Sequence, residues 1–158
     1  MTFDPNSNPY RPGPQAPASG SALPGANAAQ AFARYWRKYA DFSGRASRSE
    51  YWWVSLILFV LNIVAAALPA LSVLIALGPD GRSSTIPPLT VVALVITGAW
   101  LLATIVPGLA LLARRLHDAN FSGWFILLTF VPFGGFVVFV FTLLGPNPAG
   151  ARFDRPAA

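Results

Sequence analysis

Residues 89–113 read LTVVALVITGAWLLATIVPGLALLA, without one charged side chain, and Arg114 and Arg115 follow directly. A bilayer core of about 30 Å is crossed by roughly 20 helical residues, so this stretch is long enough to span it. A central Leu, Ile, Val or Phe favours insertion by about 0.3 to 0.6 kcal/mol, whereas a central Arg or Asp costs roughly 2.5 to 3.5 kcal/mol. We therefore expect a transmembrane helix over residues 89–113.

Two further charge-free stretches flank this one, residues 51–79 and 119–151. The first predicts a span over about residues 51–77. This span begins with Tyr51, Trp52 and Trp53, aromatic side chains that are typical of a membrane boundary. Ser47 or Ser49 can cap this helix, and Pro69 marks a kink or an end within it. Pro88 suits the first position of the helix that follows.

The third charge-free stretch predicts a span over about residues 124–144, but Pro132-Phe133-Gly134-Gly135 interrupts it. Such a sequence either kinks one helix or turns a re-entrant hairpin around. We favour the kinked span, which gives about three transmembrane helices in all. The alternative of buried helices in a soluble core is disfavoured, because a chain of 158 residues has too little other material to cover them.

The segment before the first span has two parts. Residues 1–26 are rich in proline and predict a disordered tail, which leaves residues 27–156 as a single membrane domain. In residues 27–41, aromatic side chains recur every three or four positions and cations occupy the other faces, a pattern that predicts an amphipathic helix along the headgroup region. The aromatic residues are Phe32, Tyr35, Trp36 and Tyr39, and the cations are Arg34, Arg37 and Lys38. A helix packed on the rest of the protein is compatible with the same pattern.

Composition limits the chemistry. Hydrophobic residues make up 54% of the chain and charged residues 11%, which is typical of an all-α polytopic membrane protein. No cysteine is present, so disulfides and thiolate metal sites are excluded. The net charge of +5 comes from residues that flank the apolar stretches and form no separate basic domain, so nucleic acid is not an expected partner. We expect no catalytic, cofactor-binding or metal-binding residues.

Cations are distributed unevenly between the predicted connections. The segment before the first span and the connection before the third hold most of them, and the connection between the first two spans holds only Arg82. Cytoplasmic loops gather Lys and Arg, so the amino terminus is predicted to be cytoplasmic. Three spans place the carboxyl terminus outside, which Arg152 and Arg155 argue against, whereas a re-entrant third segment returns it to the cytoplasm.

The candidate site is a polar cluster at the cytoplasmic boundary. Glu50 lies before the first predicted span, and Asp118 lies in the connection before the third. Each can pair with arginines of the other segment, and these ion pairs would anchor the two segments together. Four guanidinium groups can alternatively grip lipid phosphates, and His117 can alternatively act as a general base oriented by Asp118 or Glu50, although no nucleophile stands nearby. The cluster comprises Arg45, Arg48, Glu50, Arg114, Arg115, His117 and Asp118.

Three motifs carry a resemblance to a known family: Phe42 to Trp52, with its Gly-Arg-x-x-Arg pattern, Arg114-Arg115-Leu116-His117-Asp118, and Ser122-Gly123-Trp124. With them the chain resembles the small bacterial inner-membrane proteins known as domain of unknown function 805, over roughly residues 32–156. It departs from the family pattern in residues 150–154, where Ala151 and Asp154 replace what look like the family's Asn and Gly.

The resemblance implies a multi-pass protein of the bacterial inner (plasma) membrane and brings no biochemical activity with it. We expect a structural or interaction component, in contact with the lipid bilayer, including anionic lipid headgroups, and with a second copy or another membrane protein as a further partner. The alternative is a lipid-phosphate-binding or small-solute transport subunit, although the predicted spans contain no ionisable residue that would mark a solute path.

Overall fold

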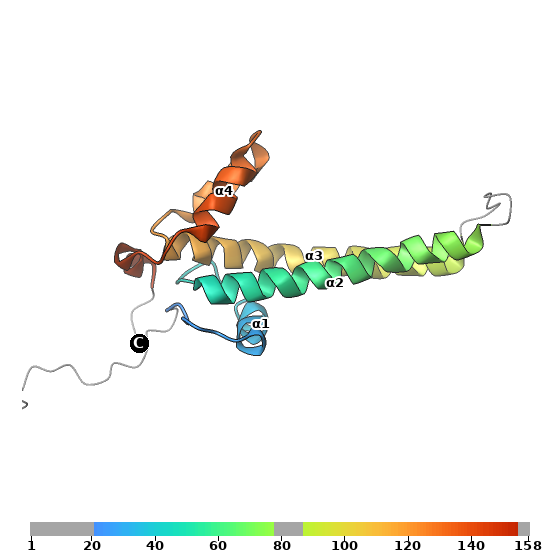
Figure 1. Cartoon of the computed structure of the whole chain (residues 1–158), viewed down its shortest axis with the longest axis horizontal. Helices are drawn as coiled ribbons and strands as arrows, with labels where there is room; N and C mark the ends of the chain where they lie inside the picture. Colours follow the sequence, from blue (N-terminus) through green and yellow to red (C-terminus); the bar gives the residue numbers. More distant parts are fainter. Residues whose placement is uncertain (1–20, 78–86, 155–158) are drawn as a thin grey trace, which may run out of the picture.

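The structure is a computed structural model that describes residues 21–77 and 87–154. Figure 1 shows α2 and α3 as one long antiparallel pair, with α1 on one side of it and α4 on the other, near the same end. Throughout the described ranges the fold is all-helical, as predicted; most of the predicted tail, residues 1–20, lies outside them. The elements are α1 (Ala28–Arg37), α2 (Arg48–Ala76), α3 (Pro88–Asp118), the 3-10 helix η1 (Gly123–Phe130), α4 (Gly134–Leu143) and the 3-10 helix η2 (Pro148–Phe153).

Helix α2 begins with a capping box. The Ser47 side chain accepts a hydrogen bond from the backbone N–H of Glu50, and the Glu50 side chain accepts one from the backbone N–H of Ser47. Two of the orphan N–H groups at the helix start are thereby satisfied. The predicted cap at Ser47 is confirmed. Helix α2 also continues through Pro69 to Ala76, so the proline does not end it.

Helix α3 begins at Pro88, as expected, and runs to Asp118, beyond the predicted end at residue 113. At about 1.5 Å per residue, the 29 residues of α2 and the 31 of α3 measure about 44 and 46 Å, more than a bilayer core requires. Only 11% of the most apolar window of either helix is buried. A soluble core helix buries its apolar face, so this exposure favours a lipid environment.

Polar side chains inside the α2–α3 pair bind each other. The indole Nε1–H of Trp100 donates to Oδ1 of Asn62 at 3.0 Å, and the hydroxyls of Ser72 and Thr90 lie 2.8 Å apart. Lipid offers no hydrogen-bonding partners, so such groups are stable in a bilayer core only when they find partners in the protein. These two contacts join α2 to α3 within their apolar segments.

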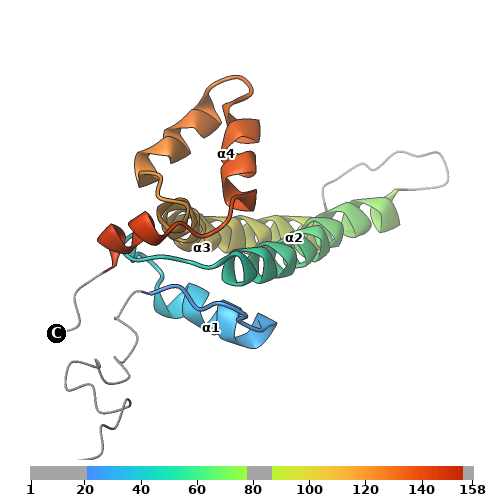
Figure 2. The same cartoon turned by 60° about the vertical axis from the view of Figure 1, so that its left-hand side comes forward.

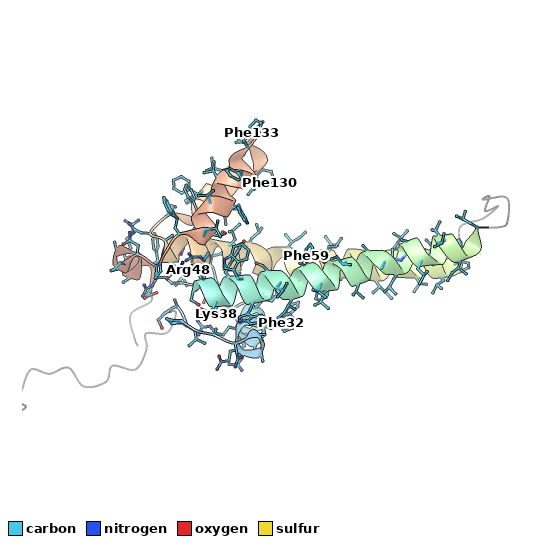
Figure 3. The ribbon with its side chains drawn as sticks, viewed as in Figure 1. Phe32, Lys38, Arg48, Phe59, Phe130 and Phe133 are labelled. Atoms are coloured by element: carbon cyan, nitrogen blue, oxygen red, sulfur yellow. The ribbon has the colours of Figure 1, made fainter. Side chains whose placement is uncertain are left out.

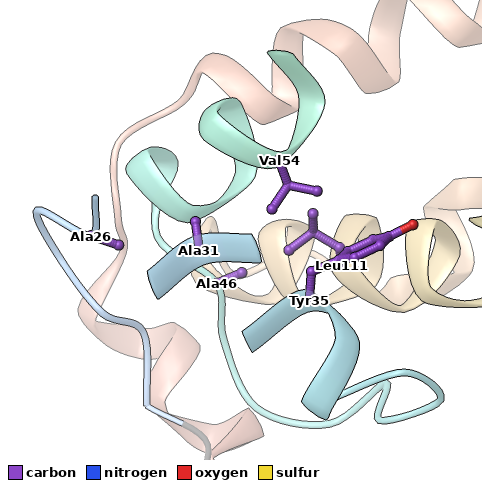
Figure 4. Packing of buried hydrophobic residues seen from close by; sticks show 6 residues of the cluster. All are labelled: Ala26, Ala31, Tyr35, Ala46, Val54 and Leu111. Atoms are coloured by element: carbon purple, nitrogen blue, oxygen red, sulfur yellow. The ribbon is translucent and has the colours of Figure 1, made fainter. Parts of the chain in front are cut away.

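Helix α1 lies across the pair and contributes two of the six residues of the compact core (Figure 4). Asn27 caps it in a capping box with Gln30, and Ala31 and Tyr35 on its inner face are buried. The hydroxyl of Tyr35 donates to the carbonyl of Thr104 in α3 at 3.1 Å. The core cluster consists of Ala26, Ala31, Tyr35, Ala46, Val54 and Leu111.

Residues 123–143 do not form a continuous span, so the favoured kinked helix is wrong. Helix η1 runs out from the α2–α3 pair and α4 returns beside it, as Figure 2 shows. The turn holds Phe133 in the left-handed conformation, with φ of 62°. Gly134 comes so close to η1 that a Cβ on it would lie 1.8 Å from the carbonyl oxygen of Leu128. We call η1, this turn and α4 the hairpin.

The surface of the hairpin is apolar. Phe130 and Phe133 lie at its far end (Figure 3) and are 84% and 89% exposed. Trp124, near its start, is 78% exposed. The 3-10 form of η1 stretches eight residues over about 16 Å, close to the roughly 15 Å of the ten-residue α4, so the two legs match in length.

The first and last described segments both lie at one end of the pair. The backbone N–H of Asn147 donates to the carbonyl of Asp118 at 2.8 Å, and that of Gly44 donates to the carbonyl of Phe153 at 2.9 Å. Residues 21–26, predicted as part of the tail, are also held there, because the backbone N–H of Leu23 donates to Glu50 at 2.8 Å. Three segments distant in sequence thus meet where α2 begins and α3 ends.

Candidate functional site at the basic end

The candidate residues all lie where α2 begins and α3 ends, which we call the basic end. In Figure 3, Lys38 and Arg48 mark this end of α2. The cluster expected from the sequence is therefore assembled in space, but its ion pairs differ from those expected. Neither Glu50 nor Asp118 forms a salt bridge with an arginine of the opposite segment. The described cations of the basic end are Arg34, Arg37, Lys38, Arg45, Arg48, Arg114, Arg115 and Arg152.

Glu50 connects α1 to α2. One carboxylate oxygen accepts from Nε of Arg34 at 2.5 Å, and the other accepts from the backbone N–H groups of Ser47 and Leu23. The carboxyl group is nearly inaccessible, and charge-assisted bonds of this kind offset the cost of burying it. Arg34 could not be predicted as its partner, because the spacing of residues does not indicate the direction in which α1 crosses α2.

Arg115 holds the carboxyl end of the hairpin. Its Nε donates to the carbonyl of Thr142 at 3.0 Å, one terminal nitrogen donates to the carbonyl of Leu144, and the other donates to Asp118 at 2.7 Å. The side chain is fully buried. A planar guanidinium can donate hydrogen bonds in three directions at once. It therefore provides partners for two carbonyls that the end of α4 would leave without hydrogen bonds.

Arg45 connects the segment before α2 to the end of the chain. Its Nε and one terminal nitrogen donate to Asp154, the closest contact being 2.5 Å. The hydrogen bond to Asp154 raises the pKa of Arg45 above its ordinary value, although burial opposes this. Asp154 was missed as a site residue because it lies 109 residues after Arg45, and the spacing of residues does not indicate that these two segments meet.

His117 is held in place by a backbone group and an aromatic ring. Its Nδ1 lies 3.1 Å from the carbonyl oxygen of Gly44, and its ring stacks on Phe153 with centroids 4.0 Å apart and planes 5° from parallel. The Arg152 guanidinium lies 4.7 Å from the Phe153 centroid. Asp118 is directed to Arg115 and Glu50 to Arg34, so neither orients His117 as the general-base hypothesis requires.

Arg114 and Lys38 differ from the other cations of the basic end. Nε of Arg114 donates to the carbonyl of Ala110 at 3.2 Å. One of its terminal nitrogens and Nζ of Lys38 are buried without a hydrogen-bond partner among the described residues. Burial lowers the pKa of Lys38, and the positive charges of Arg34 and Arg114 lower it further, while Asp41 and Glu50 oppose the change. Among the described cations of the basic end, these two side chains have the buried donors that lack a partner.

An apolar cavity of about 600 Å³ lies beside the basic end, between α3 and η1. Leu109 and Ala113 of α3 face Ile126 and Leu127 of η1 across it. His117 and Ser122 contribute the polar side chains of its wall. Within residues 21–77 and 87–154, no three His, Asp or Glu side chains come together as metal ligands would.

Comparison with known proteins identifies the family. The model described as "Protein of unknown function (DUF805)" matches residues 39–155, about three quarters of the chain. The chain belongs to this family. The DUF805 match includes both partners of the Arg45–Asp154 and Arg115–Asp118 pairs, whereas Arg34 and the rest of α1 precede it.

Two relatives of this DUF805 protein come from Escherichia coli (strain K12). Inner membrane protein YhaI is 39% identical over 116 residues, which cover 73% of this chain and 84% of that protein. Inner membrane protein YhaH is 30% identical over 118 residues, which cover 74% and 87%. No solved structure matches the chain. The family is uncharacterised, so it identifies a class of membrane protein and brings no activity.

Proposed function

We propose that this chain is a structural or interaction component of the bacterial inner membrane, which it crosses twice with α2 and α3. The observation that carries the proposal is the gathering of cations at the basic end, which supports a cytoplasmic location for that end. The names of its inner-membrane relatives and the exposed apolar faces of both helices also support it.

In this topology the amino-terminal segment and the described carboxyl end share the cytoplasmic side. The Arg45–Asp154 pair supports this, because it joins the segment before α2 to the end of the chain. A third span would carry Asp154 to the opposite side, far from Arg45. Two spans also explain Arg152, which the positive-inside rule assigns to the cytoplasm.

The hairpin enters only the cytoplasmic leaflet in this proposal. Its legs of about 15 to 16 Å reach half of a bilayer core of about 30 Å. Its far end exposes Phe130 and Phe133, which lipid would cover, and both ends of the hairpin start from the basic end. The hairpin adds volume to one leaflet only, so a structural role follows from its shape. Helix α1, with Tyr35 inward and Arg37 exposed, lies along the same boundary.

Cysteine accessibility tests this topology, because the chain contains no cysteine. Single substitutions Ala40→Cys, Ser83→Cys, Phe133→Cys and Ala151→Cys are treated with a membrane-impermeant maleimide in intact and opened cells. We expect position 83 to react from outside, positions 40 and 151 only after opening, and position 133 only in detergent. Reaction at 151 from outside would establish a third span, and reaction at 133 from outside would show that the hairpin turn reaches that side; either result would overturn the proposal.

A second candidate function is binding of lipid phosphate. Among the four guanidinium groups expected to grip a phosphate, Arg45 and Arg115 are already engaged with carboxylates, so that clamp is not assembled. The spare buried donors of Lys38 and Arg114 favour a smaller site for an anionic oxygen. Native mass spectrometry compares anionic lipid retained by Lys38→Gln and by the control Arg37→Gln, whose side chain is exposed. Equal retention by both would exclude this site.

A further inference from the structure

We infer that the cavity between α3 and η1 binds a bilayer-soluble alcohol or phenol, whose hydroxyl group donates a hydrogen bond to Nε2 of His117. This inference goes beyond the proposed structural role and does not depend on the number of spans. The cavity measures about 600 Å³, within the roughly 300 to 1,000 Å³ of ordinary small-molecule sites. It opens beside the boundary between the basic end and the apolar helices.

The walls of the cavity select an apolar molecule. Leu109 and Ala113 line it from α3, and Trp124 and Leu127 line it from η1. No Lys, Arg, Asp or Glu contributes to the described lining. A phosphate or carboxylate would therefore enter without a compensating charge, at a cost that an uncharged amphiphile avoids.

The polar wall offers a hydrogen-bond acceptor. A carbonyl oxygen only accepts, so the bond between His117 and Gly44 requires the proton on Nδ1. In the neutral imidazole, Nε2 is then an acceptor with its lone pair free. Stacking on Phe153 keeps the ring in this orientation. Ligand atoms that donate, such as a hydroxyl group, match Nε2 of His117, whereas the oxygen atoms of ethers and ketones do not.

Gly123 keeps Nε2 accessible. A Cβ at this position would lie 3.3 Å from Nε2 of His117 and 3.4 Å from Cβ of Ala113. Any side chain here would therefore crowd the acceptor and narrow the cavity between α3 and η1. The absence of a side chain at residue 123 leaves room for a ligand oxygen beside the imidazole.

The single histidine of the chain makes a direct test possible. The full-length protein is labelled with ¹⁵N-histidine in phosphatidylcholine nanodiscs, whose lipids have no hydroxyl donor. The pH is held about 1.5 units above the ordinary histidine pKa of about 6.5. Dodecanol is compared with dodecyl methyl ether, and a short-chain benzoquinol with its dimethyl ether. These two arms distinguish an aliphatic alcohol from a phenol.

We expect a saturable shift of the Nε2 resonance with the alcohol, the quinol or both, and none with either ether. A shift of equal size with the ethers would mean that the cavity takes apolar chains without the hydrogen bond. No saturable shift with any probe would mean that it takes none of them. Either result would overturn the inference.

Two substitutions separate ligand binding from the structural role of His117. The side-chain amide of His117→Asn can still donate to Gly44 but cannot reach the position of Nε2, whereas His117→Gln can place an acceptor there and loses the bond to Gly44. We expect ligand retention, measured by native mass spectrometry, to fall about tenfold in His117→Asn and to persist in His117→Gln. Equal retention by the two variants would contradict a hydrogen bond at Nε2.

Discussion

The hydroxyl of Thr97 in α3 donates a hydrogen bond of 2.9 Å to the carbonyl oxygen of Ala65 in α2. Ala65 lies four residues before Pro69, which has no N–H to offer this carbonyl. The same relationship recurs in α3, where Pro107 leaves the carbonyl of Ala103 without a helical partner and the hydroxyl of Tyr39 donates to it at 2.9 Å. The prolines inside α2 and α3 are thus each compensated by a hydroxyl from another part of the chain, Thr97 of α3 in one case and Tyr39 of the turn after α1 in the other.

Thr97→Val tests this compensation. The substitution keeps the shape of the side chain and leaves the carbonyl of Ala65 unpartnered, so we expect a loss of about 1 kcal/mol in the free energy of unfolding in micelles. Pro69→Ala restores the helical N–H, so Thr97→Val should cost much less in that background. Thr104→Val is the matched control, because its hydroxyl bonds only carbonyls of its own helix. Equal costs of Thr97→Val in both backgrounds would refute the coupling.

Tyr35 makes stability depend on alkaline pH. Burial, aided by the nearby Tyr39, raises the pKa of Tyr35 from 10.0 to about 12. When the pKa of a group is higher in the folded protein than in the unfolded chain, its contribution to stability is complete below the pKa of the unfolded chain. This contribution is lost as the pH rises to the pKa of the folded protein. We therefore expect stability to fall between about pH 10 and 12. Unfolding measured across this range should show a shallower fall in Tyr35→Phe, and an identical fall would contradict the assignment.

Arg115→Lys should release the carboxyl end of the hairpin. A lysine ammonium cannot reach Thr142, Leu144 and Asp118 together, whereas the guanidinium does. Loss of a buried ion-pair partner costs about 3 to 5 kcal/mol, and a lysine recovers part of this. Hydrogen exchange of the amides of residues 134–144 should accelerate relative to those of α2. Arg48→Lys, at an exposed arginine of the same end, should leave exchange unchanged.

Two adjacent glycines give a matched test of the hairpin turn. A Cβ at residue 134 would overlap the carbonyl oxygen of Leu128, whereas a Cβ at residue 135 meets nothing within 4 Å. We expect Gly134→Ala to open the hairpin and Gly135→Ala to be neutral or slightly stabilising, since alanine favours helix over glycine by about 1 kcal/mol. The distance between spin labels at residues 126 and 139 measures the opening. Closed hairpins in both variants would contradict the close approach.

Features governed by local rules could be predicted from the sequence. The cap at Ser47, the start of α3 at Pro88 and the two long apolar helices each depend on residues a few positions apart. The hairpin could not be chosen over a kinked span, because Pro132 and Gly134 allow both conformations and both keep charges out of lipid. What decides between them is a contact between Gly134 and Leu128, which composition does not reveal.

The pairing within the candidate site was harder to predict than its membership. All seven predicted residues lie at the basic end, yet Glu50 pairs with Arg34 and Arg45 with Asp154. Each choice depends on where a separate segment docks, α1 in one case and the carboxyl end in the other. Neither contact between segments produces a periodic pattern in the sequence. Charge and spacing could therefore identify which residues lie at the basic end, but not which of them pair.

The Arg115–Asp118 pair bears on the order in which the chain assembles. The two residues belong to one helical turn of α3, so they can pair as soon as that helix exists. The chain is synthesised from its amino terminus, and α4 emerges later. Arg115, which donates to the last carbonyls of α4, can by then already be paired with Asp118 and oriented by it. The docking place for α4 can therefore form without α4, from residues of α3 alone.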